Sequence, residues 1–234
     1  MKLLNTIIVL AGGTGEVGEG MTRSFLSEGA TVVVPIRSKD KGEKLKEYVA
    51  DLSSGTLDLV PANIGDPEQA EEFKRQVLAR HHKIDMAIAS LGGWYQGYDL
   101  ADMPYEMWTT IMTNNLTSHF IFARTVIPVL RKQDSGWYIN INGGAQDFAI
   151  PQAGGMTIIS SAQNRMTEVL YKEAEGKGYE VRSVAAFSPV KTRARGTQVE
   201  SSWVSAEGMG KYITKLYLGG ISEDPITHKL YSDG

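Results

Sequence analysis

A glycine-rich turn, Ala11-Gly12-Gly13-Thr14-Gly15-Glu16-Val17-Gly18, separates an apolar run at residues 6–10 from a helix-patterned segment at residues 17–28. Glycine adopts the positive φ angles of a tight turn at little cost, and its bare backbone lets a pyrophosphate approach closely. A turn of this composition can also serve only to connect a strand to a helix. Its place between a first strand and a first helix favours dinucleotide binding instead. The residues expected to contact the dinucleotide are Gly12, Thr14, Gly15, Val17 and Gly18.

Strand-like and helix-like segments alternate along the whole chain. Strands are predicted over residues 6–10, 31–36, 57–62, 84–90, 137–141, 181–187 and 229–231. Helices are predicted over residues 17–28, 39–50, 67–80, 154–175 and 206–218, and residues 104–132 are expected to form one broken helix or two adjacent ones. Strands joined by helix-length connections pair in parallel through right-handed crossovers. The pattern therefore predicts an α/β, Rossmann-like, doubly wound sheet of seven mainly parallel strands with helices on both faces.

Composition and charge narrow the function classes. The 234 residues are 42% hydrophobic, which is enough for a full core, and no linker or repeat divides them, so residues 1–234 are expected to form a single domain. The net charge is −3 and no run of Lys and Arg occurs, so neither nucleic acid nor a membrane is expected as a partner. The chain has no cysteine and four scattered histidines, so no metal site is expected. No apolar stretch is long enough to span a bilayer, which favours a soluble, cytoplasmic protein.

The second predicted strand ends in Pro35-Ile36-Arg37-Ser38-Lys39. An NAD-selective site has an acidic residue at this place, which accepts a hydrogen bond from the ribose 2′-hydroxyl. This chain has Ile36 there, followed by Arg37 and Ser38, which suit the 2′-phosphate of NADP(H). An arginine at the start of a helix can also be merely solvated. The absence of an acidic residue and the presence of Arg37 nevertheless both favour NADP(H). We therefore expect NADP(H) rather than NAD(H), held in part by Arg37 and Ser38.

Taken in order, these features resemble the short-chain dehydrogenase/reductase family, and the resemblance covers nearly the whole chain. The spacing of Gly12, Gly15 and Gly18 is nearer that of the family's extended or atypical branches, because the commoner spacing would place the middle glycine at Glu16. The resemblance implies a nicotinamide cofactor, an oxidoreductase activity and a homodimer or homotetramer. The subunits of such an oligomer are expected to meet through the helices at residues 104–132 and 154–175.

Further landmarks of the family follow the later strands. Asn63-Ile64 resembles the segment that contacts adenine, and Ala89-Ser90-Leu91-Gly92 stands in the place of the family's Asn-Asn-Ala-Gly. Ser188-Pro189-Val190-Lys191-Thr192 is similar to the loop that holds the nicotinamide carboxamide, although it lacks the glycine and is shorter. The ending at residues 226–234 resembles the family's last strand and Asp-Gly terminus. By resemblance, the cofactor contacts also include Asn63, Ile64, Ser90, Gly92, Pro189 and Thr192.

The family's catalytic side chains are replaced in this sequence. The resemblance implies a serine after the fifth strand and a Tyr-x-x-x-Lys pair on the next helix, where the lysine lowers the tyrosine pKa for general acid–base catalysis. The matching positions hold Gly143, Met156 and Ser160. None of the ten tyrosines is followed four positions later by a lysine. Of the four catalytic positions only Asn115 is retained, and a structural role for it is about equally compatible with the sequence.

Other side chains could take over proton transfer. Loops at the carboxyl ends of the strands carry Tyr95, Tyr98, Asp147 and Lys191, so a tyrosine could donate a proton while Lys191 lowers its pKa. The simpler interpretation, which we favour, is that the tyrosines line a pocket and the charged groups are solvated. Two functions stay open: an NADP(H)-dependent oxidoreductase acting on a small carbonyl or enoyl substrate through a non-standard site, and a catalytically inactive NADP(H)-binding sensor or regulatory protein.

Overall fold

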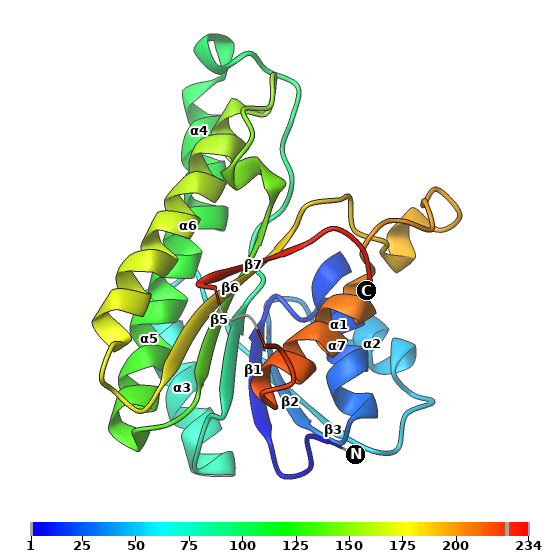
Figure 1. Cartoon of the computed structure of the whole chain (residues 1–234), viewed down its shortest axis with the longest axis vertical. Helices are drawn as coiled ribbons and strands as arrows, with labels where there is room; N and C mark the ends of the chain where they lie inside the picture. Colours follow the sequence, from blue (N-terminus) through cyan, green and yellow to red (C-terminus); the bar gives the residue numbers. More distant parts are fainter. Residues whose placement is uncertain (1, 223–224, 234) are drawn as a thin grey trace.

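A seven-stranded parallel sheet forms the centre of the molecule, with strand order β3-β2-β1-β4-β5-β6-β7 (Figure 1). The computed structural model describes residues 2–222 and 225–233. The strands are β1 (Ile7–Ala11), β2 (Thr31–Ile36), β3 (Thr56–Pro61), β4 (Met86–Ala89), β5 (Trp137–Gly143), β6 (Glu180–Ala186) and β7 (Thr227–Leu230). The predicted α/β, doubly wound fold is confirmed, and all seven predicted strands are present. Gly234 of the Asp-Gly ending lies outside the described residues.

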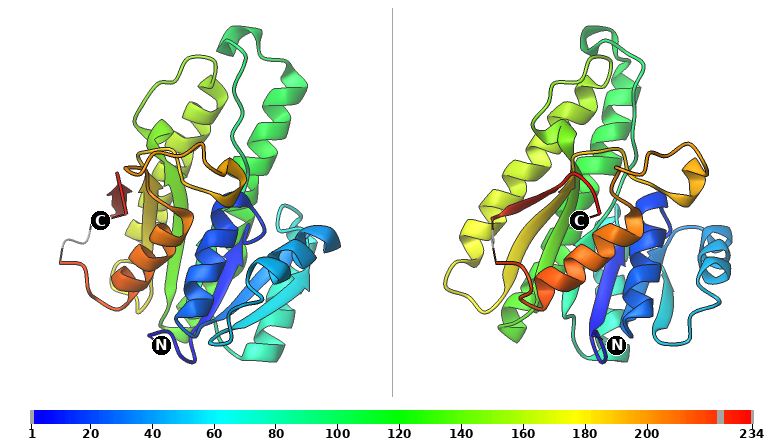
Figure 2. Two further views of the ribbon diagram at one scale, coloured as in Figure 1. Left: turned by 90° about the vertical axis from the view of Figure 1, so that its right-hand side faces the viewer. Right: turned by 45° about the vertical axis from the view of Figure 1, so that its right-hand side comes forward.

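Helices cover both faces of this sheet. They are α1 (Glu16–Ser27), α2 (Lys39–Tyr48), α3 (Pro67–His81), α4 (Tyr105–Ile111), α5 (Ser118–Gln133), α6 (Gly154–Ala174) and α7 (Ala206–Tyr217). One face is covered by α3, α5 and α6, and the other by α1, α2 and α7 (Figure 2). Among the described residues, no helix is long and apolar enough to cross a membrane.

The alternation of side chains along β1 explains why both faces need helices. Ile7 and Val9 pack into the core under α3, α5 and α6, whereas Ile8 and Leu10 pack into the core under α1, α2 and α7. Successive side chains of a strand point to opposite faces, so a fully apolar strand is stable only where both faces are covered. All five residues of β1 and all four of β4 are buried, as expected for neighbouring central strands.

The segment expected to be a broken helix or two adjacent ones is instead continuous. Helix α4 passes into α5 through a π-helical turn at Met112–Thr117, without an interruption of the helical backbone. A π turn inserts an extra residue into an α-helix and is frequent at functional sites. Asn115 lies inside this turn and is buried.

The topology fixes where a ligand can bind. The chain runs from β1 outward to β2 and β3, and then returns to place β4 on the other side of β1. In open parallel sheets a crevice forms at such a reversal, outside the carboxyl ends of the strands. The glycine turn and the loop after β4 both open onto this edge of the sheet.

Candidate functional site

The glycine turn contains two kinds of glycine. Gly12 has a φ of +91°, and a Cβ atom there would lie 1.9 Å from the carbonyl oxygen of Ser90. A Cβ atom at Gly18 would lie 2.0 Å from the carbonyl oxygen of Gly12. Both glycines are therefore required by the packing of the turn itself.

Gly15 is not required in this way. It is exposed, has a φ of −83°, and forms the N-cap of α1 without a side-chain cap; the nearest atom to an added Cβ would be the carbonyl oxygen of Gly12, at 3.2 Å. The missing side chain leaves the first N–H groups of α1 accessible, as an anion site at a helix N-terminus requires. Thr14 and Val17 are half-buried on either side of it.

The first turn of α1 is tied to the segment after β6. Thr192 Oγ1 donates to Glu16 Oε2 over 3.3 Å, and Arg193 donates to both carboxylate oxygens of the buried Glu19 over 3.0 and 2.8 Å. The Glu19 carboxylate raises the pKa of Arg193 above its usual value. These bonds fasten the expected nicotinamide loop to the helix that would receive the pyrophosphate. Sequence reasoning did not find this pairing, because the partners are 174 positions apart.

Arg37 and Ser38 differ in their engagement at the end of β2. Ser38 is the N-cap of α2, and its hydroxyl accepts from the Lys41 N–H over 3.4 Å. Arg37 is exposed, and its guanidinium has no hydrogen bond or ion pair among the described residues. A positive charge that folding leaves unpaired is available to an anionic ligand.

The segment after β3 is mainly structural. Asn63 Oδ1 accepts from the Gly65 N–H over 3.1 Å, and the Asn63 N–H donates to Gln69 Oε1 over 3.0 Å. Ile64 is buried in the core under α3 and α5. The backbone turn of this segment lies at the carboxyl edge, but the Ile64 side chain points into the core.

Asn115 holds the loop after β4. Its Oδ1 accepts from the Gly93 N–H over 2.8 Å, and its Nδ2 donates to the Ile111 carbonyl over 3.0 Å. Gly92, with a φ of +98°, comes so close that a Cβ atom would lie 1.8 Å from Asn115 Oδ1. The Asn115 carbonyl accepts from Gln163 Nε2 over 2.7 Å. Every polar side-chain atom of Asn115 is used within the fold, which supports the structural interpretation of this residue.

His119, on α5, also contacts the loop after β4. It is fully buried, and its ring nitrogens Nε2 and Nδ1 lie 3.1 Å from the Leu91 carbonyl oxygen and 2.9 Å from Asn140 Oδ1, respectively. Burial lowers the pKa of His119 below its usual value. Nothing in the spacing of the four histidines singled out His119, because its partners come from other elements of the fold. Among the described residues, no cluster of three metal-ligating side chains occurs.

The three positions at which the resemblance implies catalytic side chains lie on β5 and α6 and carry no titratable group. Gly143 is the last residue of β5, and a Cβ atom there would meet only the Ala186 carbonyl, at 3.6 Å. Met156 and Ser160 lie one turn apart on α6 and are both nearly buried. The Ser160 carbonyl accepts from Asn142 Nδ2 over 2.9 Å. None of these three side chains can act as a general acid in the way that a Tyr-x-x-x-Lys pair does.

The alternative proton donors do not form the arrangement that would activate a tyrosine. Tyr95 packs against an apolar cluster that includes Met156, and Tyr98 forms a bridge with Ala153 at the start of α6. Lys191 pairs with Asp233 over 3.0 Å and donates to the Ser201 carbonyl over 3.1 Å. Asp147 pairs with Lys229. The Lys191 ammonium is therefore held by Asp233 and the Ser201 carbonyl, and the alternative pairing with Tyr95 or Tyr98 is absent among these contacts.

A cluster of aromatic rings lies at the carboxyl edge of the sheet and was not predicted from the sequence. Phe148 and Phe187 have ring centroids 5.8 Å apart, and Phe187 and Tyr231 have centroids 5.4 Å apart. The three rings follow β5, β6 and β7, which are neighbouring strands of the sheet. The signal in the sequence that could have predicted this cluster is that each ring follows the carboxyl end of a strand.

Known proteins share this fold and sequence pattern. A family model described as enoyl-(acyl carrier protein) reductase matches residues 13–215. A 3-oxoacyl-[acyl-carrier-protein] reductase FabG of Thermotoga maritima is 25% identical over 185 residues, which cover 79% of this chain and 74% of that protein. The short-chain dehydrogenase/reductase dpmpG of Macrophomina phaseolina is 28% identical over 149 residues, which cover 62% of this chain and 83% of that protein.

Solved structures are similar over the full length. A metagenomic short-chain oxidoreductase in complex with NADP superposes with a TM-score of 0.83 at 19% identity, covering 98% of both chains. Levodione reductase superposes with a TM-score of 0.87 at 16% identity, covering 99% of this chain and 98% of that one. At these identities the two structures establish the Rossmann-like fold alone.

Proposed function

Because this chain belongs to the short-chain dehydrogenase/reductase family, we propose that it binds NADP(H) and transfers hydride to a small carbonyl or enoyl substrate through a non-standard catalytic site. Two observations carry the cofactor proposal: the open N-terminus of α1 at Gly15, and the exposed Arg37 directly after the neighbouring strand β2, which has no hydrogen bond or ion pair among the described residues. The first suits a pyrophosphate, and the second suits a 2′-phosphate. Residues 1–234 are proposed to act as one domain.

The residues proposed to hold the cofactor surround the crevice at the carboxyl edge. Gly12, Thr14, Gly15, Val17 and Gly18 would face the pyrophosphate, and Arg37 and Ser38 the 2′-phosphate. Asn63 and Ile64 would lie beside adenine through their backbone, and Ser90, Gly92, Pro189 and Thr192 along the nicotinamide half. A solved relative with this fold is in complex with NADP, which supports the choice of cofactor.

Replacing Arg37 with alanine is expected to weaken NADPH binding about 10- to 100-fold and to leave NADH binding unchanged. The reason is that a hydrogen bond to a charged group contributes about 1.5–3 kcal/mol, and every 1.4 kcal/mol is a factor of ten in affinity. Titration calorimetry with both nucleotides measures the change. Lys39→Ala, which removes an exposed positive charge two positions further on, is the matched control. Equal weakening of NADPH and NADH by Arg37→Ala would contradict this role.

The second candidate function is a catalytically inactive NADP(H)-binding sensor or regulatory protein. The observation in its favour is that Gly143, Met156 and Ser160 place no proton donor at the usual site. A missing general acid typically costs a factor of about 10²–10⁴ in rate. Binding of NADPH without oxidation across a panel of ketones, enones and conjugated acceptors would support the sensor over the oxidoreductase.

We also propose a homodimer or homotetramer formed through α4, α5 and α6. These helices expose large apolar side chains to solvent: Tyr105, Phe120, Ile158 and Val169. Exposed apolar groups on neighbouring helices mark interaction surfaces when they are contiguous. Light scattering at micromolar concentration is expected to give at least a dimeric mass, and Phe120→Glu is expected to shift the mass toward the monomer. A monomeric mass for the unmodified protein would refute the proposal.

A further inference from the structure

Phe148, Phe187 and Tyr231, called here the aromatic platform, form an exposed apolar surface at the carboxyl edge of the sheet. The Phe148 and Phe187 rings meet edge to face at 71°, and the Phe187 and Tyr231 rings are tilted by 48°. Phe148 is 58% exposed and Tyr231 is 64% exposed. Large aromatic side chains with this exposure leave ring faces and edges available to a planar ligand.

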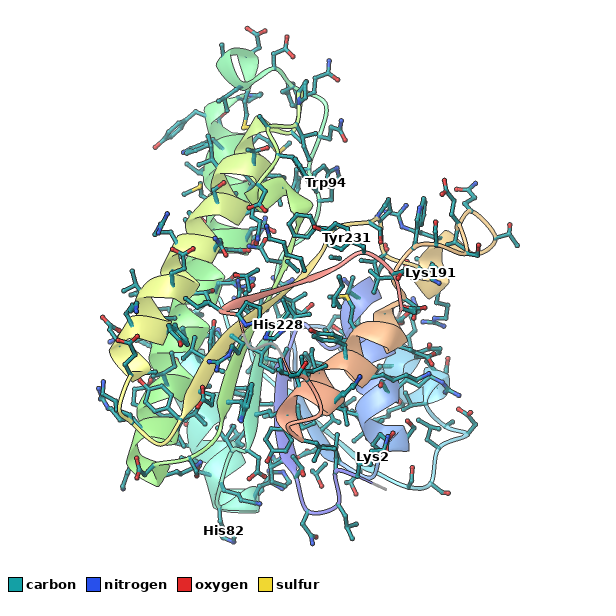
Figure 3. All side chains as sticks on the ribbon, viewed as in Figure 1. Lys2, His82, Trp94, Lys191, His228 and Tyr231 are labelled. Carbon is teal, nitrogen blue, oxygen red and sulfur yellow. The ribbon has the colours of Figure 1, made fainter. Side chains whose placement is uncertain are left out.

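The aromatic platform borders the proposed nicotinamide position. A Cβ atom added to Gly144 would lie 3.4 Å from the Phe148 ring and 3.7 Å from the Phe187 ring, so these rings cover Gly144. Gly143, the preceding residue, has the position of the family's catalytic serine. Phe187 directly precedes Ser188-Pro189, where the expected nicotinamide loop begins. Tyr231 lies at the same end of the sheet as Trp94 and Lys191, and opposite to Lys2 and His82 (Figure 3).

A positive charge lies against the aromatic platform. The Lys229 ammonium is 4.9 Å from the centroid of the Phe187 ring, and it pairs with the Asp147 carboxylate. Lys229 and Asp147 are both partly exposed. A ligand lying on the platform would therefore have an ammonium group beside it, where it can stabilise a negative oxygen that develops during reaction.

The missing proton donor restricts which acceptors can react. Hydride addition to a simple ketone produces an alkoxide, which is about as basic as hydroxide and needs an enzymatic acid. Hydride addition to a quinone produces a phenolate-type anion, and a phenol loses its proton only near pH 10. Such an anion is stable enough in water to take its proton from solvent. A site with Gly143, Met156 and Ser160 at the catalytic positions is suited to the second kind of acceptor.

We propose that the aromatic platform binds a planar quinone and that this site reduces it to the hydroquinone, an inference that rests on the proposed NADP(H) function. In the reaction the C4–H bond of the dihydronicotinamide breaks, and the hydrogen leaves with both bonding electrons to form a bond to the quinone. NADPH becomes NADP⁺, and the quinone becomes the hydroquinone anion. The negative oxygen lies near the Lys229 ammonium and then takes one proton from water. Stacking on Phe148 and Tyr231 selects planar, conjugated acceptors over saturated ketones.

The test compares NADPH oxidation with menadione, a naphthoquinone, and with cyclohexanone, a saturated ketone, using the full-length protein. Menadione is expected to be reduced at least 100-fold more efficiently in kcat/KM. Stacking on an aromatic side chain contributes about five- to 150-fold in affinity by alanine substitution. Tyr231→Ala and Phe148→Ala are therefore each expected to raise the KM for menadione about tenfold, with kcat within twofold. Lys229→Met is expected to lower kcat about tenfold.

Two controls separate this inference from loss of folding and from failure of the cofactor proposal. Leu4→Ala removes an exposed apolar side chain near the amino end of β1, far from the platform, and is expected to leave the menadione KM unchanged. Calorimetric titration of each variant with NADPH is expected to give the unmodified affinity. Failure of the unmodified protein to bind NADPH would refute the proposed function and this inference together.

If NADPH binds, three results would overturn the quinone proposal alone. The first is equal turnover of menadione and cyclohexanone, and the second is turnover of neither. The third is an unchanged menadione KM in Tyr231→Ala and Phe148→Ala together with a lower mass in light scattering. That last result would assign the aromatic platform to an interface between copies of the chain.

Discussion

Replacing Gly15 with aspartate is expected to weaken NADPH binding by a factor of about 100 or more, while the melting temperature changes by no more than about 2 °C. Gly15 is the N-cap of α1 and is exposed, so the new side chain would accept from the first N–H groups of the helix. These are the groups proposed to bind the pyrophosphate, and the carboxylate also repels it. Opposed like charges cost several kcal/mol, and about 2.8 kcal/mol corresponds to a factor of 100. Titration calorimetry and a thermal melt of the same sample measure both quantities.

The matched comparison for this experiment is Gly12→Ala in the same turn. Gly12 has a positive φ, and its Cβ atom would collide with the Ser90 carbonyl, so alanine at this position is expected to lower the melting temperature clearly. Gly15→Asp is expected to retain the fold, because aspartate is among the preferred N-cap residues. Unchanged NADPH affinity in a folded Gly15→Asp protein would show that α1 does not receive the pyrophosphate.

The triple variant Gly143→Ser, Met156→Tyr, Ser160→Lys is expected to reduce a simple ketone with NADPH about 10²- to 10⁴-fold faster than the unmodified protein. It restores the family's proton donor, and general acid catalysis contributes a factor of that size. The backbone is already arranged for it: a Cβ atom at Gly143 meets nothing closer than 3.6 Å, and positions 156 and 160 lie one turn apart on α6. Steady-state oxidation of NADPH with cyclohexanone measures kcat/KM.

The control for the triple variant carries phenylalanine instead of tyrosine at Met156. It has nearly the same volume and the same serine and lysine, but lacks the phenol hydroxyl. The tyrosine variant is expected to exceed it by at least about tenfold, within the range typical of general acid catalysis. Equal rates in two folded, NADPH-binding variants would show that the cofactor and the position of residue 156 do not meet in this protein.

The fold was predictable because it depends on local patterns that repeat. The predicted strand at residues 31–36 agrees with β2 at both ends. A β-branched run lies there between Gly29, which follows α1, and Ser38, the N-cap of α2. The glycine turn was predictable for the same reason, because close backbone approaches at Gly12 and Gly18 require that residue type. The π turn was not predictable: the residues at 112–117 continue the helical pattern, and the hydrogen bond from the Gly93 N–H to Asn115 joins this turn to a loop distant in sequence.

The side-chain partners in the site were not predictable, since each joins segments that are distant in sequence. Lys191 could be placed on a loop at the carboxyl edge, but its pairing with Asp233 depends on the course of the C-terminal segment. The bonds from Thr192 and Arg193 to the first turn of α1 depend on how the segment after β6 folds back. The aromatic platform arises because β5, β6 and β7 are neighbours in the sheet. The order of the strands in the sheet cannot be read from the positions of these three rings in the sequence.

The measurement that tests the central claim most directly is a calorimetric titration of the unmodified protein with NADPH and, separately, with NADH. We predict saturable binding of one NADPH per chain, with an affinity at least about tenfold above that for NADH, because Arg37 is proposed to meet the 2′-phosphate and Ile36 stands where an NAD-selective site has an acid. Absence of binding by both nucleotides would contradict the account and leave a Rossmann-like sheet whose crevice serves another ligand.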